Sequence, residues 1–348
     1  MRGLLIAVVL VAACGEDNGN GGPYVPIDQI DQGYKTAECK HLVMCGEFAD
    51  QATCEAANLT VTFTVQQAAV NAVLAGRMYY KGDVLAACFD AIATRTCDTT
   101  DADGRFDTAC TVSPFRGAQH AGDPCGLDVE CISGVCSGNS QGSGSNCILG
   151  TCVGDTAPAT HPPAPIGQPC AFGTGSGPAC VMGAYCDTTN TATCAALKTS
   201  GMVCNTSNEC DYGLGCLGST ARTCKPLPAL NQPCPDFTCR DEGQVCGGTS
   251  QVCTAYALLG QSCMSAQCSP YYMCDNTTLK CVKLPGLGQA CPSSRCGDAG
   301  TFCDTSLTTP MCVALKANGA ACTSSNQCQS DFCDTVNGSV CAVTATCN

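Results

Sequence analysis

The sequence predicts small disulfide-rich repeats in a semi-rigid array, preceded by a small α-helical domain that disulfides staple together. Three observations support this. The 348 residues include 37 cysteines, no Trp and only 5% aromatic residues, so disulfides must replace part of the core that a chain of this length normally buries. The cysteine spacing repeats from residue 122 onward, and helical periodicity fills the cysteine-poor segment before it. Because disulfides on this scale persist only in oxidising compartments, we expect an exported protein.

The first thirteen residues have the layout of a secretory signal. Arg2 precedes an apolar stretch, Leu4 to Val11, that is too short to span a bilayer. Residues 11–14, Val-Ala-Ala-Cys, resemble a bacterial lipobox, a motif in which cleavage before the cysteine is followed by its lipidation. The resemblance implies a lipoprotein signal peptide at 1–13 and a lipid anchor at Cys14. Three acyl chains there would bind a membrane more firmly than a single acyl chain does. Ordinary cleavage after Ala13, leaving a free thiol, is the alternative.

Residues 14–26 are polar and glycine-rich, which predicts a flexible tether. No aspartate follows Cys14, and by analogy with the enteric sorting rule this implies a lipid-anchored protein of the outer membrane, exposed at the cell surface. The net charge is −13 with only 13% charged residues. Such a surface repels phosphate backbones, so nucleic acid is not expected as a partner.

Residues 27–118 are predicted to form the helical domain. Apolar residues recur at nearly a 3.6-residue period in 34–48, 65–78 and 84–93, and Asp50 is placed to cap a short helix through Glu55. The sequence leaves open how the six cysteines of this segment pair. They are Cys39, Cys45, Cys54, Cys88, Cys97 and Cys110.

Seven cysteine-rich modules, numbered 1 to 7 here, make up the rest of the chain. Module 1 occupies 122–153, a Pro-rich hinge is predicted at 154–166, and six tandem modules fill 167–348. The modules open at Cys125, Cys170, Cys204, Cys234, Cys263, Cys291 and Cys322.

Within a module we expect the first cysteine to pair with the third and the second with the fourth. These loops are longer than those between adjacent cysteines, so they restrict the unfolded chain more. In module 5 this gives Cys263–Cys274 and Cys268–Cys281.

A tight turn is predicted three residues before each opening cysteine. Six modules have glycine there and module 4 has Asn231, the two residues that best tolerate a positive φ. The turn glycines are Gly122, Gly167, Gly201, Gly260, Gly288 and Gly319.

The joint between consecutive modules has a fixed length from module 2 onward. Each fourth cysteine is ten positions from the next opening cysteine, although spacings inside the modules vary. An apolar residue stands three positions into every joint: Leu197, Leu227, Tyr256, Leu284 and Leu315. This predicts that each module docks on the next in one orientation, giving a rod with contacts only between neighbours. Recent duplication is the alternative.

Modules 1 and 7 have five cysteines each, and Cys147 is the insertion in module 1. Beyond Cys14 the chain has 36 cysteines. If all of them pair, at least one disulfide must cross a module boundary.

Residues 125–136, Cys-Gly-Leu-Asp-Val-Glu-Cys-Ile-Ser-Gly-Val-Cys, resemble the opening of the Dickkopf-type N-terminal cysteine-rich repeat, and the segments from Cys204 and Cys322 resemble it more weakly. Together with the lipobox and the helical segment, the chain resembles the cysteine-rich surface lipoproteins of myxobacteria. The resemblance covers about residues 120–345 and implies a disulfide-rich interaction module without known catalytic residues.

The motifs for metal binding and catalysis are weak. No Cys-x2-Cys pair exists to favour zinc or redox chemistry, and the Gly-x-Ser-x-Gly match at 138–142 lies in a flexible loop of small polar residues. The three histidines, His41, His120 and His161, assemble no triad. Asp98, Asp101, Asp103 and Asp107 lack the carboxylates that an EF-hand requires. We therefore expect no cofactor and no metal, with a weak calcium site near Asp101 left open.

The sequence thus predicts a non-enzymatic, membrane-anchored lipoprotein whose rod binds an unknown protein or surface ligand. Candidate recognition residues are the apolar ones in variable loops, which alternatively cover disulfides: Phe172, Tyr212, Phe237, Tyr271 and Tyr272. A proteinase inhibitor is the alternative function, with its reactive loop around Arg295 between Cys291 and Cys296.

Overall fold

The computed structural model describes residues 23–57, 67–99, 110, 112–138, 140–141, 147–157, 163–170, 180–188, 192–218, 221–248, 251–298, 300–330, 332–335 and 338–342. The predicted signal peptide, Cys14, most of the tether and Asp101 lie outside these residues.

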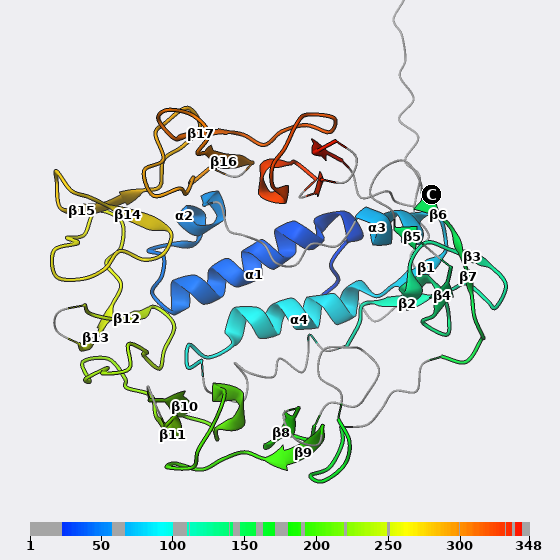
Figure 1. The fold of residues 1–348 in the computed structure, drawn as a ribbon, viewed down its shortest axis with the longest axis horizontal. Coiled ribbons are helices and arrows are strands. Elements are labelled where there is room, and N and C mark those ends of the chain that lie inside the picture. Colours follow the sequence, from blue (N-terminus) through cyan, green and yellow to red (C-terminus); the bar gives the residue numbers. More distant parts are fainter. Residues whose placement is uncertain are drawn as a thin grey trace, which may run out of the picture.

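Two helices packed against each other, α1 (Ile30–Met44) and α4 (Gly82–Thr94), form the centre of the helical domain (Figure 1). Their apolar faces bury a cluster that includes Ile30, Leu85 and Phe89. The remaining elements are η1 (Ile27–Gln29), α2 (Gln51–Ala56), α3 (Gln67–Leu74) and the antiparallel strands β1 (Met78–Tyr80) and β2 (Phe115–Gly117). The predicted small helical domain is confirmed.

A side-chain cap sets the start of α2, and disulfides connect α1 and α4 to other segments of the domain. Asp50 precedes α2, and its side chain accepts a hydrogen bond from the Thr53 backbone N–H at 2.8 Å, as an N-cap residue does. Three disulfides close within the domain: Cys39–Cys54, Cys45–Cys97 and Cys88–Cys110. Since Cys39 and Cys88 lie on α1 and α4, the disulfides tie each long helix to a later segment.

Each module is built on a short antiparallel hairpin. In modules 2 to 7 the strand pairs are β8 (Ala184–Asp187) with β9 (Thr193–Ala196), β10 (Leu214–Leu217) with β11 (Thr223–Pro226), β12 (Gln244–Cys246) with β13 (Cys253–Ala255), β14 (Tyr272–Asp275) with β15 (Lys280–Lys283), β16 (Thr301–Asp304) with β17 (Met311–Ala314), and β18 (Cys333–Asp334) with β19 (Val340–Cys341). In every one of these hairpins the third and fourth cysteines are directly opposite each other, as in Cys274 and Cys281.

Module 1 has more strands than the others. A three-stranded sheet runs in the order β3 (Pro124–Cys125), β7 (Gly150–Cys152), β4 (Cys136–Ser137), beside the hairpin of β5 (Ser140–Gln141) and β6 (Cys147–Ile148). Its third and fourth cysteines, Cys136 and Cys152, are again opposite each other. Modules 1, 3 and 7 each add a single 3-10 turn: η3 (Asp128–Glu130), η4 (Ser207–Glu209) and η5 (Ser325–Gln327).

The disulfides of all seven modules join the first cysteine to the third and the second to the fourth. Module 5 contains Cys263–Cys274 and Cys268–Cys281, and the other six modules have the same pattern. In module 1 the Sγ atoms of Cys125, Cys131 and Cys136 lie within 4.8 Å of one another. The two disulfides of a module therefore form one compact sulfur core.

The residue three positions before each opening cysteine lies in the left-handed region. The six turn glycines have φ between 77° and 92°, and Asn231 has φ 66°. In all seven modules the N–H of this residue donates to the carbonyl of the fourth cysteine, as Gly260 does to Cys281 at 2.8 Å. The N–H of the fourth cysteine donates back to the residue after the turn position, as Cys281 does to Gln261 at 2.8 Å. The turn is thus part of the hydrogen-bonded frame around the fourth cysteine.

One extended segment serves both modules at a joint. In four of the five joints the third residue donates its N–H to a glycine of the preceding module, as Leu197 does to Gly183 at 3.1 Å. The next residue, Lys198, forms a parallel bridge with Cys210, the second cysteine of the following module. Equivalent parallel bridges join Ala257 to Cys268 and Lys316 to Cys328. A joint bonded at both ends has little freedom in length, which explains the constant spacing.

The array does not extend as a rod with contacts only between neighbours; this part of the prediction is wrong. From β3 and β7, through β8–β15, to β16 and β17, the hairpins pass around α1 and α4, so the helical domain lies inside the curve (Figure 1). Contacts join residues far apart in sequence, for example His41 and Glu242, which are 201 positions apart.

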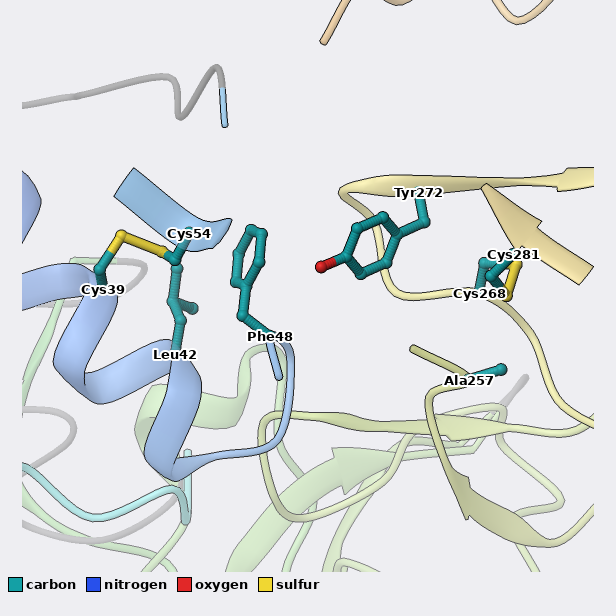
Figure 2. Packing of buried hydrophobic residues seen from close by; sticks show 8 residues of the cluster. All are labelled: Cys39, Leu42, Phe48, Cys54, Ala257, Cys268, Tyr272 and Cys281. Atoms are coloured by element: carbon teal, nitrogen blue, oxygen red, sulfur yellow. A yellow bond between two sulfur atoms is a disulfide. The ribbon is translucent and has the colours of Figure 1, made fainter. Parts of the chain in front are cut away.

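Apolar burial is one reason for this wrapping. Phe48, which follows α1, is 2% exposed and faces Tyr272 of module 5 (Figure 2). Its ring centroid is 4.4 Å from that of Tyr271 and 5.8 Å from that of Tyr272. Leu42 and the Cys268–Cys281 disulfide belong to the same cluster. A chain with few aromatic residues therefore uses three of them to join its two parts.

The 17 disulfides among the described residues use 34 of the 37 cysteines. The other three are Cys14, Cys147 and Cys347, so the predicted disulfide across a module boundary lies outside the side chains that the structure describes. If Cys14 is lipidated, Cys147–Cys347 is the pairing that remains. We expect non-reducing peptide mapping of the mature protein to find this cross-link; free thiols at both positions would contradict it.

Candidate interaction surface

The sulfur core frees most other side chains of a module for contact with a partner. In modules 1, 3 and 7 the buried apolar cluster consists of four cysteines, for example Cys204, Cys210, Cys216 and Cys224. Side chains between these cysteines are therefore placed mostly at the surface. Loops on a rigid frame are the usual location of binding residues.

Modules 1, 3 and 7 use an acidic or amide side chain inside the module. Glu130, Glu209 and Gln327 accept hydrogen bonds of 3.0 to 3.1 Å from the backbone N–H that follows the first cysteine. Each also binds a cationic side chain from the preceding unit: Arg77, Lys198 and Lys316 respectively. Lys198 and Lys316 also lie 5.6 Å from the centroids of aromatic rings in the preceding modules, Tyr185 and Phe302. These groups join modules and are not free to recognise a ligand.

The Glu209 carboxylate shows how strongly such a joint is held. Burial opposes its ionisation, but the hydrogen bonds from the Lys198 ammonium and the Asn205 backbone outweigh burial, so the pKa of Glu209 lies below its ordinary value. The same contact raises the pKa of Lys198. Both groups are thus charged at neutral pH, and the pair favours one orientation of module 3 on module 2.

Modules 2, 4, 5 and 6 present an apolar residue at the tip of the turn before the opening cysteine. These residues are Ile166, Leu230, Leu259 and Leu287, which are 39 to 60% exposed. The tips are braced in three of these modules, because a glutamine Oε1 accepts the N–H at the start of the turn at 2.9 to 3.0 Å. Modules 1, 3 and 7 have Ala121, Ser200 and Asn318 at this position. Apolar tips therefore belong to the modules whose described residues contain no 3-10 turn.

The loop between the first and second cysteines adds a second exposed apolar position. Phe237 of module 4 is 65% exposed and has φ 59°, and Met264 of module 5 is 75% exposed. A phenylalanine in the left-handed region is strained, and an exposed ring offers no burial in return. The ring of Phe237 therefore adds little apolar burial to the module and lies at its surface.

The other predicted recognition residues lie elsewhere. Tyr271 and Tyr272 pack against Phe48 in the interior, so their prediction as free recognition residues is wrong and the alternative, a core role, is correct. Tyr212 is half-buried. Phe172 lies outside the described residues. The exposed apolar residues at the turn tips were not predicted from the sequence. They could have been found there, because an apolar residue directly precedes the turn position in four of the seven modules.

No catalytic or metal-binding arrangement emerges among the described residues. His41 is buried against Glu242, and His120 lies 3.1 Å from Asp155 at the exposed surface. Asp98 pairs with Arg240 at 3.5 Å, whereas His161 and the predicted weak calcium site near Asp101 lie outside the described residues. Cysteine clusters with geometry suited to a metal are oxidised to disulfides, as in module 3.

Comparison with known proteins gives a distant relative. Cell-cell adhesion glycoprotein 64 of Heterostelium pallidum is 34% identical to this chain over 142 residues, which cover 38% of this chain and 44% of that protein. The chain thus spans less than half of its relative. No family model and no solved structure matches. None of the helices described is long and apolar enough to cross a membrane. The chain is therefore a cysteine-rich disulfide-repeat protein distantly related to an adhesion glycoprotein.

Substitution of two phenylalanines tests the assignment of Phe48 to the core and of Phe237 to the surface. Phe48→Ala should destabilise the protein by about 3 kcal/mol, because a buried ring leaves a cavity against Tyr271. Phe237→Ala should change stability by about 0.5 kcal/mol or less, because the ring is exposed. Denaturant unfolding with intact disulfides measures both. Equal losses in the two variants would contradict this assignment.

Proposed function

We propose that this chain is a non-enzymatic surface protein whose array of modules mediates adhesion through its apolar tips. The observation that carries the proposal is the series Ile166, Leu230, Leu259 and Leu287, each exposed on a turn that hydrogen bonds and disulfides hold in place. Exposed apolar side chains on rigid loops lose little entropy on binding. The similarity to an adhesion glycoprotein supports the same class of function.

The location that we propose is the outer surface of a cell, with Cys14 as a lipid anchor in the outer membrane. The number of disulfides supports an extracellular position. The proposed anchor and bacterial envelope rest on the lipobox at 11–14 and on the resemblance to myxobacterial lipoproteins. In this arrangement the tether connects the bilayer to the helical domain, which holds modules 4 and 5 beside it.

Bead clustering tests the adhesive role. Beads coated with the mature chain carrying Cys14→Ser should aggregate or bind cells of the source organism. Combining Leu230→Ser, Leu259→Ser and Leu287→Ser should reduce binding about tenfold or more, because these side chains supply the apolar contact. The matched control combines Val112→Ser, Leu149→Ser and Leu307→Ser, three exposed apolar residues elsewhere. Equal binding by both triple variants would reject the turn tips as the adhesive surface.

The anchor needs a separate test. In a host with lipoprotein processing enzymes, the wild-type chain should incorporate labelled fatty acid and sediment with membranes. Cys14→Ser should abolish the label and release the protein, because the acyl chains at Cys14 supply the membrane affinity. Membrane association that survives this substitution without label would contradict a lipid anchor at Cys14.

The proteinase-inhibitor alternative gains less support. Arg295 is exposed, but Ser294 before it has φ 57° and donates its N–H to the Cys291 carbonyl at 3.0 Å. The segment is therefore a closed turn, whereas a substrate mimic must lie extended along the cleft of a protease.

A further inference from the structure

The hairpin of β1 and β2 presents two basic side chains and one aromatic ring on the same face. Tyr79 and Arg116 are opposite each other in the antiparallel pair, so their side chains lie on one face. Lys81 continues the pairing, because its N–H donates to the Pro114 carbonyl at 2.8 Å, and strand alternation places it on this face too. Tyr79 is 54% exposed, and both cations are exposed. We call Tyr79, Lys81 and Arg116 the hairpin face.

The other face of the hairpin belongs to the core of the helical domain. Tyr80 and Phe115 are also opposite each other, and their ring centroids are 5.5 Å apart. Both rings pack against the buried cluster of α1 and α4. The Tyr80 hydroxyl donates to the Val25 carbonyl at 2.7 Å. The core thus fixes the backbone that displays the hairpin face.

The two cations of the hairpin face are not neutralised by the protein. None of the ion pairs among the described residues involves Lys81 or Arg116, and exposed Asp83, two positions after Lys81, forms none with it. Arg77, which precedes β1, differs because Glu130 of module 1 binds it at 3.1 Å. The whole chain has a net charge of −13 and only 16 basic residues. The hairpin face is therefore a basic, anion-attracting surface on an acidic protein.

The proposed tether meets the helical domain beside this hairpin. Val25 donates its N–H to the Gly82 carbonyl at 3.1 Å, and a Cβ on Gly82 would lie 2.6 Å from the Tyr24 ring. The chain from Cys14 thus reaches the domain at the residue that follows Lys81. Ten positions separate Cys14 from Tyr24, and ten residues span at most about 35 Å. An anchor at Cys14 therefore keeps the hairpin face close to the bilayer.

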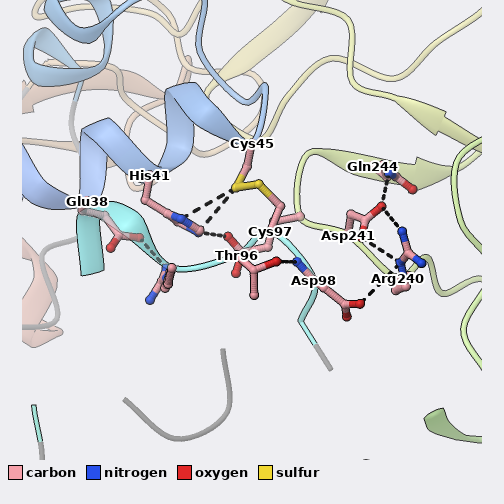
Figure 3. Close-up of a disulfide and its surroundings, with 11 residues drawn as sticks. Glu38, His41, Cys45, Thr96, Cys97, Asp98, Arg240, Asp241 and Gln244 are labelled. Carbon is pink, nitrogen blue, oxygen red and sulfur yellow. Dashed lines mark hydrogen bonds and ion pairs between the residues drawn. A yellow bond between two sulfur atoms is a disulfide. The ribbon is translucent and has the colours of Figure 1, made fainter. Parts of the chain in front are cut away.

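Module 4 is attached at the opposite end of α4. This helix begins directly after Lys81, and the segment that follows its end, 97–99, pairs with 240–242 of module 4. Figure 3 shows this attachment, where an Asp98 carboxylate oxygen lies 3.5 Å from Nε of Arg240. In Figure 1, β1 and β2 lie at one end of α4 and β12 lies toward the other. Since α4 has 13 residues, about 20 Å of helix separates the two ends.

We propose that the hairpin face docks on the phosphate-bearing headgroups of the bilayer that holds Cys14, so that module 4 is directed away from the membrane. The inference rests on the proposed lipid anchor. Lys81 and Arg116 bind the headgroup phosphates, because each cation at an anionic membrane surface adds affinity. The Tyr79 ring lies among the headgroups, where a side chain with an apolar body and a polar end is stable. The short tether makes this contact intramolecular, so three side chains are enough.

Tryptophan fluorescence tests the docking, because the chain has no Trp of its own. A hexahistidine tag replaces residues 1–14 and holds the chain on vesicles of phosphatidylcholine and phosphatidylglycerol that contain a nickel-chelating lipid. A nitroxide on the headgroups should quench a Tyr79→Trp variant about twofold more than a Phe237→Trp variant, because only position 79 lies at the headgroups. Phe237 is the matched position, since its ring is 65% exposed in module 4. Equal quenching at the two positions would overturn the proposal.

The tag also separates the docking from the anchor. Since it takes the place of the acyl chains, the quenching does not depend on whether Cys14 is lipidated. The fatty-acid label described above tests the anchor alone, so the failure of either proposal is seen in its own experiment.

Charge substitutions assign the contact to the hairpin face. In the Tyr79→Trp background, Lys81→Gln combined with Arg116→Gln should remove most of the excess quenching, because the headgroup phosphates lose both cations. The matched control, Lys225→Gln with Lys280→Gln, removes two exposed cations from modules 3 and 5 and should leave the quenching unchanged. Circular dichroism verifies that all variants are folded. Excess quenching that survives the first pair of substitutions, or that falls equally with the control pair, would overturn the role of the hairpin face.

Discussion

The pairing of two opposed cysteines on one hairpin is the constraint on which the modules depend. The third and fourth cysteines are opposite each other, and each is bonded to a cysteine outside the hairpin, as in Cys274–Cys263 and Cys281–Cys268. The fourth cysteine also exchanges backbone hydrogen bonds with the turn that precedes the module. Covalent bonds and turn geometry thus supply the stability that apolar packing gives to larger domains, so few other side chains are needed inside.

This arrangement explains both the surface of the array and its shape. A module that is stable on its sulfur core can place Phe237 and Met264 in solvent. On the Phe48 side the helical domain contributes the Cys39–Cys54 disulfide and Leu42 to the buried cluster, and the Phe48 ring completes it by packing against Tyr271 and Tyr272 of module 5. The array therefore curves toward the domain, because that is where its aromatic residues find partners.

The fold class and the helices could be predicted because their signals are local. Asp50 caps α2 through a contact three residues away, and glycine or asparagine before each opening cysteine has the positive φ that these residue types tolerate. The wrapping could not be predicted, because a pattern of neighbouring residues gives no sign that His41 meets Glu242. Tyr271 and Tyr272 were misplaced for the same reason: a hairpin tyrosine is exposed or buried according to what docks on it.

Aromatic residues of similar size thus have opposite roles in adjacent modules. Phe237 and Tyr272 both lie in disulfide-held segments, yet one is exposed in a strained turn and the other is buried against Phe48. Because the sulfur core fixes the backbone in either case, a module can exchange a buried aromatic contact for an exposed one without losing its frame. The same repeat can therefore supply a docking face for the helical domain in one module and a surface for a partner in the next.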